Sequence, residues 1–199
     1  MGVFSHAMSS PADLYISADI EADGAIPGRY SMLSFGLAVA GRFDGKDFKR
    51  RDPELQTFYR ELRPISNAFD GDALEVAGLD RDELRRTGAD PKAAMSEAAR
   101  FVSKAAGDDR PVLVGFPVPF DWMFLYWYFV NFTGDSPFDF SSALDMKTIF
   151  QTKAGVVLSE AGKDDLPDEL RSTRPHTHNA LEDAIEQADI FAKLFVWTP

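Results

Sequence analysis

Alternating apolar and polar positions over the first third of the chain predict three antiparallel β-strands. We expect them at residues 14–21, 30–40 and 57–62, with turns at residues 24–28 and at Asp44-Gly45. The alternation is strict in the first strand, so Ser17, Asp19 and Glu21 are expected to share one face, opposite its apolar residues. The pattern therefore predicts a small antiparallel sheet with two carboxylates on the same side of its first strand.

A period of three to four residues, with clear capping residues, predicts helices in the rest of the chain. A short helix is expected at residues 70–77 before Gly78, and a longer one from the N-cap Asp90 to Gly107. A strand at residues 112–116 leads into an aromatic helix at residues 120–132, which Asp121 opens. The last helix begins at His178, and its expected buried stripe is Leu181, Ala184, Ile185, Ala188, Ala192 and Phe195. This order of elements predicts an α/β fold, a mixed sheet flanked by helices.

The aromatic helix is apolar on every face, and such a helix must be covered on every face. Its aromatic residues are Phe120, Trp122, Phe124, Tyr126, Trp127, Tyr128, Phe129 and Phe132. One interpretation is stacking on nucleobases, which contributes about 1–3 kcal/mol per base. The other is burial in the core together with a homodimer surface. We favour the second and expect a homodimer.

The composition narrows the class of protein. With 199 residues, 45% of them hydrophobic, we expect a soluble protein with one domain at residues 13–199. Residues 1–12 are interpreted as an irregular leader, in which residues 1–9 are a candidate remnant of expression. The absence of cysteine excludes disulfides and cysteine-ligated metals, and it is compatible with the cytoplasmic location that we expect. Pro117, Pro119 and Asp121 interrupt the longest apolar stretch, so no membrane span is predicted.

The net charge of −11 argues against a protein that coats long nucleic acids. The densest basic run, Lys49-Arg50-Arg51, lies among acidic residues and is interpreted as a solvated loop. Arg171 and Arg174 are alternative candidates for a phosphate contact. The charge favours short or end-bound substrates.

The candidate chemistry lies in three separate segments. Asp19 and Glu21 share a strand face, Asp121 follows a buried strand, and His178 precedes Asp183 by five residues. Neighbouring carboxylates repel each other unless they are protonated or a cation neutralises them, and such oxygen ligands suit Mg²⁺ or Mn²⁺. Each segment alone also has a structural interpretation, as a solvated strand end, a helix N-cap or a helix start. Their order on strand, helix start and final helix favours metal-dependent phosphoryl-transfer chemistry.

This combination resembles the DEDD superfamily of 3′→5′ exonucleases, in the branch that uses a histidine and includes proofreading exonucleases, ribonuclease T and oligoribonuclease. The first motif is Asp19-Ile20-Glu21-Ala22-Asp23-Gly24, and the third is His178-x-Ala180-x-x-Asp183. The second motif ends in Phe120-Asp121, but Phe116-Pro117 stands where the family often reads His-Asn. The resemblance implies a ribonuclease H-like sheet of three antiparallel strands plus parallel strands.

The resemblance also implies a mechanism. Two divalent ions, Mg²⁺ or Mn²⁺, would lie about 3.5–4 Å apart. Their expected ligands are Asp19, Glu21, Asp121 and Asp183. His178 would act as the general base, in preference to His176, and nucleoside 5′-monophosphates would be released from single-stranded 3′ ends. RNA is expected to be favoured over DNA.

Substrate contacts follow from the same resemblance. Ala22, Asp23 and Gly24 are expected to contact the terminal nucleotide, and Leu74 and Val76 to pack on its base. Ribonuclease T and oligoribonuclease are dimers, which supports the expected homodimer. Two other functions stay open: a catalytically silent nuclease fold kept for binding, and a metal-dependent phosphodiesterase that acts on small nucleotides.

Overall fold

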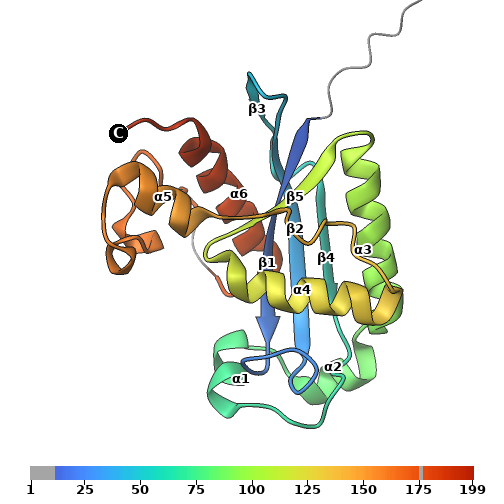
Figure 1. Ribbon diagram of the computed structural model, residues 1–199. Coiled ribbons are helices and arrows are strands. Elements are labelled where there is room, and N and C mark those ends of the chain that lie inside the picture. Colours follow the sequence, from blue (N-terminus) through green and yellow to red (C-terminus); the bar gives the residue numbers. More distant parts are fainter. Residues whose placement is uncertain (1–11, 175–176) are drawn as a thin grey trace, which may run out of the picture.

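The computed structural model in Figure 1 describes residues 12–174 and 177–199. Its centre is a six-stranded sheet in which the neighbours follow the order β3-β2-β1-β5-β6, while β4 also pairs with β2. The strands are β1 (Asp13–Ala22), β2 (Met32–Phe43), β3 (Phe48–Arg50), β4 (Thr57–Glu61), β5 (Arg110–Gly115) and β6 (Ala143–Asp145).

The sheet is mixed, as the sequence predicts. β1 is antiparallel to β2 and parallel to β5, and β5 is parallel to β6. β2 starts and ends later than expected, and Lys49 and Arg50 lie in β3 and not in a loop. The expected combination of antiparallel and parallel strands is confirmed.

Helices cover both faces of the sheet. The pair α3 (Pro91–Ala106) and α4 (Val118–Thr133) packs on one face, while α5 (Met146–Ala154) and α6 (Ala180–Val196) pack on the other (Figure 1). Leu14, Ile16, Ala18 and Ile20 of β1 belong to the core under α3 and α4, whereas Tyr15 belongs to the core under α6. Asp19 and Glu21 follow Tyr15 with period two, so they lie on the α6 side.

Two short helices, α1 (Gly71–Ala77) and α2 (Arg81–Thr87), lie near the C-terminal end of β1 (Figure 1). Asp70 caps α1 and Gly78 ends it with a φ of 63°, which confirms the predicted helix. Asp90 and Gly107 bound α3 in the same way. The elements that were not predicted are β3, α2, β6 and α5, and the short 3₁₀ turns at Leu158–Glu160 and Lys163–Asp165.

The start of α4 differs from the expectation. The helix begins at Val118, so Asp121 lies in its first turn and does not open it. Pro119 is tolerated there because the first-turn N–H groups have no partner inside a helix. The N-cap residue Pro117 makes no side-chain capping hydrogen bond. Instead, Asp145 Oδ1 accepts the N–H of Val118 at 3.1 Å.

The last helix is also shifted. It begins at Ala180 with Asn179 as its N-cap, so His178 lies just before it. Leu181, Ile185 and Phe195 are only partly buried, whereas Phe191 and Leu194 are fully buried. The predicted stripe was therefore rotated, because Leu166 and Leu170 cover a second side of the helix in addition to the sheet. Among the described residues, no helix has the length and apolar character that a membrane span requires.

Candidate active site

The three separate sequence segments meet at one pocket of about 290 Å³. All five predicted catalytic residues line it, namely Asp19, Glu21, Asp121, His178 and Asp183. Ile20, Phe116, Pro117, Phe120 and Lys163 complete the lining. The pocket therefore combines four carboxylates, one imidazole and one ammonium group with an aromatic rim.

The position of Asp121 depends on where β5 ends. The pairing of β1 with β5 stops at Ser17 and Val114, so the N–H of Ile20 extends past the neighbouring strand. Asp121 Oδ1 accepts this N–H at 3.1 Å, and the side chain is 6% exposed. The hydrogen bond joins the first turn of α4 to β1 between Asp19 and Glu21.

A glycine in β2 allows the start of α6 to come close. Gly36 pairs with Asp19, and a Cβ atom added at Gly36 would lie 2.3 Å from the carbonyl oxygen of Ala180. The helix thus rests directly on the backbone of the sheet, beside the carboxylates of β1. This contact brings Asp183 and His178 to Asp19 and Glu21.

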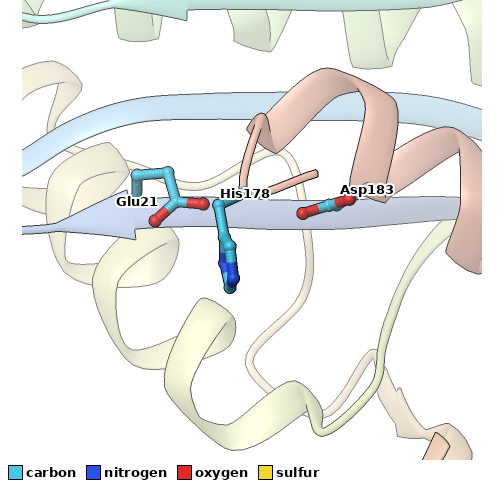
Figure 2. Close-up of side chains that lie close together, drawn as sticks. All are labelled: Glu21, His178 and Asp183. Atoms are coloured by element: carbon cyan, nitrogen blue, oxygen red, sulfur yellow. The ribbon is translucent and has the colours of Figure 1, made fainter. Parts of the chain in front are cut away.

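Figure 2 shows how the side chains of Glu21 and Asp183 point toward His178 from the strand and from the helix. One ligand atom from each of these three residues lies within 4.8 Å of the others. Asp183 is fully buried, and its Oδ1 accepts the N–H of Thr177 at 3.0 Å. His178 is exposed and has a φ of 55°, a conformation that is uncommon outside glycine.

Burial and mutual repulsion perturb the carboxylates. Burial, followed by the charge of Asp183, raises the pKa of Asp19 to about 7. Burial, followed by the charges of Asp19 and Asp183, raises the pKa of Glu21 to about 8. Burial and the charge of Asp19 also raise the pKa of Asp121 well above its usual range. The ionised form of such a carboxylate is stabilised when a divalent cation compensates its charge.

Three polar residues at the site were missed by sequence reasoning. Gln187, 1% exposed, donates from Nε2 to Asp19 Oδ1 at 2.7 Å. Lys163 Nζ forms an ion pair with Glu186 Oε2 at 3.0 Å, and the charge of Lys163 lowers the pKa of Asp19 and of Asp121. Glu186 and Gln187 lie three and four positions after Asp183, so helical spacing was the available signal.

A second pocket of about 440 Å³ adjoins the first and shares Ile20, Glu21 and Phe120 with it. It is also lined by Ala22 and Gly24 from the first motif and by Val76 of α1, which is 58% exposed. These three residues therefore lie where substrate contacts were predicted.

Two predicted substrate contacts lie elsewhere. Leu74 packs against Leu33, Ala77 and Leu84, so it belongs to a small core cluster. Asp23 is fully buried, and an ion pair with Arg81 at 2.5 Å compensates its charge. The predicted substrate contacts of Leu74 and Asp23 stay predictions, and neither side chain lines the second pocket.

The basic candidates are engaged in structural contacts. Arg174 pairs with Glu54, and Arg171 donates to the carbonyl oxygens of Leu166 and Asp164. His176, the alternative to His178, lies outside the described residues, as do residues 1–11 of the predicted leader.

The chain resembles known proteins in sequence and in fold. No family model matches the chain. It is 34% identical over 185 residues to the 3′-5′ DNA exonuclease Cap18 of Escherichia coli, and the match covers 92% of both chains.

Solved structures share the fold at lower identity. The nuclease domain of 3′hExo, a DEDDh family member bound to rAMP, superimposes with a TM-score of 0.65 at 16% identity, over 94% of both chains. Cell-death related nuclease 4 gives 0.65 at 14% identity over 93% of this chain and 64% of its own. Exonuclease I of E. coli in complex with a dA16 oligonucleotide superimposes with a TM-score of 0.63 at 16% identity, over 92% of this chain and 40% of its own. The chain thus spans only part of the last two proteins.

The fold places the motif residues of this family at one pocket, and a relative of equal span has more than 30% identity. The chain belongs to the DEDD superfamily of 3′→5′ exonucleases, hydrolases of phosphodiester bonds, in its histidine-containing branch.

Proposed function

We propose that this protein is a metal-dependent exonuclease that releases nucleoside 5′-monophosphates from the 3′ ends of single-stranded nucleic acids. The observation that carries the proposal is the convergence of Asp19, Glu21, Asp121, Asp183 and His178 on one pocket of about 290 Å³. The silent binding module loses support, because every position that the chemistry requires holds a suitable side chain.

The donor set fits divalent cations. Asp19, Glu21, Asp121 and Asp183 supply carboxylate oxygens, which suit Mg²⁺ or Mn²⁺ better than softer metals. Burial, followed by the charges of neighbouring carboxylates, raises the pKa of Asp19 to about 7 and that of Glu21 to about 8, so their ionised forms are costly without a cation. Bound divalent ions would supply Lewis acidity at the scissile phosphate. Two ions of Mg²⁺ or Mn²⁺ are the cofactor that we propose.

The protein's own groups are held in place around this site. Hydrogen bonds from Gln187, Ile20 and Thr177 orient Asp19, Asp121 and Asp183. Because these carboxylates are fixed before substrate arrives, little reorganisation accompanies the reaction. His178 is exposed at the edge of the pocket, where it can accept a proton from the attacking water.

The adjoining pocket suits the terminal nucleotide. It shares Glu21 with the carboxylate site and presents the exposed apolar side chains of Val76 and Phe120. We propose that the terminal base packs there, with Ala22 and Gly24 leaving room for the sugar. A free single-stranded end reaches this pocket without unpairing, which explains a preference for single strands.

The substrate can carry deoxyribose or ribose, that is, it can be DNA or RNA. The relative Cap18 is named a DNA exonuclease, which supports DNA as a substrate. The motif resemblance to stand-alone ribonucleases supports RNA, and a phosphodiesterase for small nucleotides is the competing activity. We propose single-stranded DNA as the first substrate to test, with RNA of the same sequence beside it.

The test uses oligonucleotides labelled at the 5′ end, with Mg²⁺ or Mn²⁺. A ladder that shortens by single nucleotides, and that EDTA abolishes, is the expected result. The variants Asp19→Asn and Asp183→Asn should yield no ladder, and calorimetry should show weakened Mn²⁺ binding. Uncut oligonucleotides together with cleavage of dinucleotides alone would replace the proposal by the small-nucleotide activity. Unaltered Mn²⁺ binding in Asp19→Asn would overturn the metal assignment.

A further inference from the structure

The outer side of α4 carries a groove that the proposed chemistry does not use. Its volume is about 520 Å³, and it is lined by Pro27, Trp122, Met123, Tyr126, Trp127 and Val130. No lining residue carries a charge. We call it the α4 groove.

The aromatic residues of α4 divide into two sets. Phe124, Tyr128 and Phe129 are fully buried in the core, as expected for this helix. Trp122 and Tyr126 are only partly buried, and their rings stack on each other with centroids 4.9 Å apart. Trp122, Met123 and Trp127 pack against the core with part of their surface, and the rest of that surface lines the α4 groove.

The α4 groove has a fixed shape. Gly28 lies against Trp127, and a Cβ atom added at Gly28 would be 3.1 Å from its ring. The ring of Trp127 also contacts Tyr128 and Phe132 edge to face. Because these contacts hold the indole in place, the groove is preorganised to receive a flat ligand.

The α4 groove and the nucleotide pocket share no lining residue, but they follow each other along two segments of the chain. The same two segments form the walls of both. Helix α4 supplies Phe120 to the pocket and Trp127 to the groove, and these two residues lie two turns apart on the same face of the helix. The turn after β1 supplies Ala25 to the pocket and Pro27 to the groove. A strand whose end lies in the pocket can therefore continue along α4, which crosses the front of the sheet in Figure 1.

The overall charge limits how such a strand can be bound. A net charge of −11 provides little attraction for phosphates, and Arg50 and Arg174 are paired with Asp189 and Glu54. Stacking on aromatic side chains needs no positive charge and accepts any base. An acidic nuclease therefore gains most affinity for further nucleotides from exposed rings.

We propose that the α4 groove is a second binding site, which takes the bases of one or more nucleotides upstream of the terminal two by stacking on Trp122 and Tyr126. This inference rests on the proposed exonuclease function and extends it from the chain end to the single strand behind it. The competing occupant is a second copy of this chain, the homodimer expected from the sequence.

The test compares Trp122→Ala and Tyr126→Ala with the wild type on a dinucleotide and on a single-stranded 12-mer. The KM for the 12-mer should rise ~10-fold for each ring removed, since stacking is worth ~1–3 kcal/mol per base. The kcat, and all constants for the dinucleotide, should stay unchanged. Trp122→Phe should restore binding. Phe140→Ala is the matched control, because Phe140 is 76% exposed and lies outside the α4 groove.

Binding without turnover gives an independent measurement. Titration of the metal-free protein with the 12-mer should quench tryptophan fluorescence, and the quenching should decrease in Trp122→Phe and Tyr126→Ala. If the wild type cleaves the 12-mer and the alanine variants bind it equally well, the groove assignment is wrong and the exonuclease proposal stands. If no substrate is cleaved, the exonuclease proposal fails, whatever the titration shows. If light scattering finds a wild-type dimer that Trp122→Ala converts to a monomer, a second copy occupies the groove.

Discussion

The amide of Gln187 helps to orient Asp19. Gln187 reaches it from α6 and donates to one oxygen of this pocket-lining carboxylate at 2.7 Å. Among the described residues, Gln187 Oε1 has no hydrogen-bond partner, so the amide is placed for Asp19 and not for a network of its own.

We therefore predict that Gln187→Met lowers Mn²⁺ affinity or activity by roughly 10–100-fold, the usual effect of removing a group that orients a metal ligand. The fold should persist, because methionine has a similar shape. Calorimetry with Mn²⁺ measures the loss, and Gln56→Met, at an exposed glutamine, serves as the control. Wild-type metal affinity in Gln187→Met would show that Asp19 needs no such support.

His178 and His176 are separated by one residue, and among the described residues His178 lies with Glu21 and Asp183. We predict that His178→Ala loses roughly 10²–10⁴-fold in rate, as expected for the loss of a general base. His176→Ala should retain most of the rate. Single-turnover kinetics on a labelled oligonucleotide measures both. An inactive His176→Ala beside an active His178→Ala would shift the third motif by two residues.

The carboxylates also predict how stability varies with pH. Asp19 and Glu21 have folded pKa values of about 7 and 8, above the 3.8 and 4.5 of the free groups. Between about pH 4 and pH 8 the folded state binds more protons than the unfolded state, so the free energy of unfolding falls as the pH rises.

In EDTA the Tm should therefore decrease across this window, by about 2–4 °C for each kcal/mol lost. Mn²⁺ should raise the Tm more at pH 8 than at pH 5, because it binds the ionised carboxylates. Thermal unfolding at several pH values measures this, and the double variant Asp19→Asn, Glu21→Gln should respond less to pH. Equal pH dependence in both proteins would contradict the assignment.

At the scale of elements, capping residues were the most informative signal. Asp70 with Gly78, and Asp90 with Gly107, bound helices as predicted. The three residues of β6 are too few for a periodic pattern, and α5 follows it directly at the N-cap Asp145. The packing of residues 158–171 against a second side of α6 could not be predicted either, because it is a tertiary contact that the local sequence pattern does not specify.

The meeting of α6 with the sheet yields a prediction of its own. Gly36→Ala places a Cβ atom 2.3 Å from the Ala180 carbonyl oxygen, and a backbone atom cannot rotate away. The helix start must shift, which should destabilise the protein by about 1–3 kcal/mol and weaken metal binding. Thermal unfolding and calorimetry test both effects. Gly71→Ala is the control, since a Cβ atom there has no neighbour within 4 Å. An unchanged Tm would show that α6 can be displaced without cost.

At the scale of the whole molecule, motif spacing predicted which residues would meet at one pocket, and the mixed sheet flanked by helices is confirmed. All five catalytic candidates were placed at one pocket, because the chemistry restricts their residue types and strand alternation fixes Asp19 and Glu21. The burial of Leu74 and Asp23 could not be predicted, since it depends on which side of a turn is buried. Lys163 could not be predicted, because an irregular segment carries it to the pocket.

The acidic surface predicts weak electrostatic dependence of substrate binding. Each phosphate contact to a single strand contributes about −0.7 to the slope of log K against log salt concentration. With few such contacts, the slope should stay below about 2 in magnitude, measured by fluorescence anisotropy of a labelled oligonucleotide. Initial rates should be highest on single strands and on 3′ tails, and low on the blunt duplex. Equal rates on all three, or a steep slope, would contradict this picture.

The docking of α6 onto Gly36 has a consequence for the cell that makes this protein. Asp19, Glu21 and Asp121 leave the ribosome early, but Asp183 and its neighbours on α6 are among the last residues of the sequence. A nascent or prematurely terminated chain thus holds three of the four carboxylates and lacks the histidine. The proposed site is therefore complete only after α6 has been synthesised and has docked onto the sheet at Gly36.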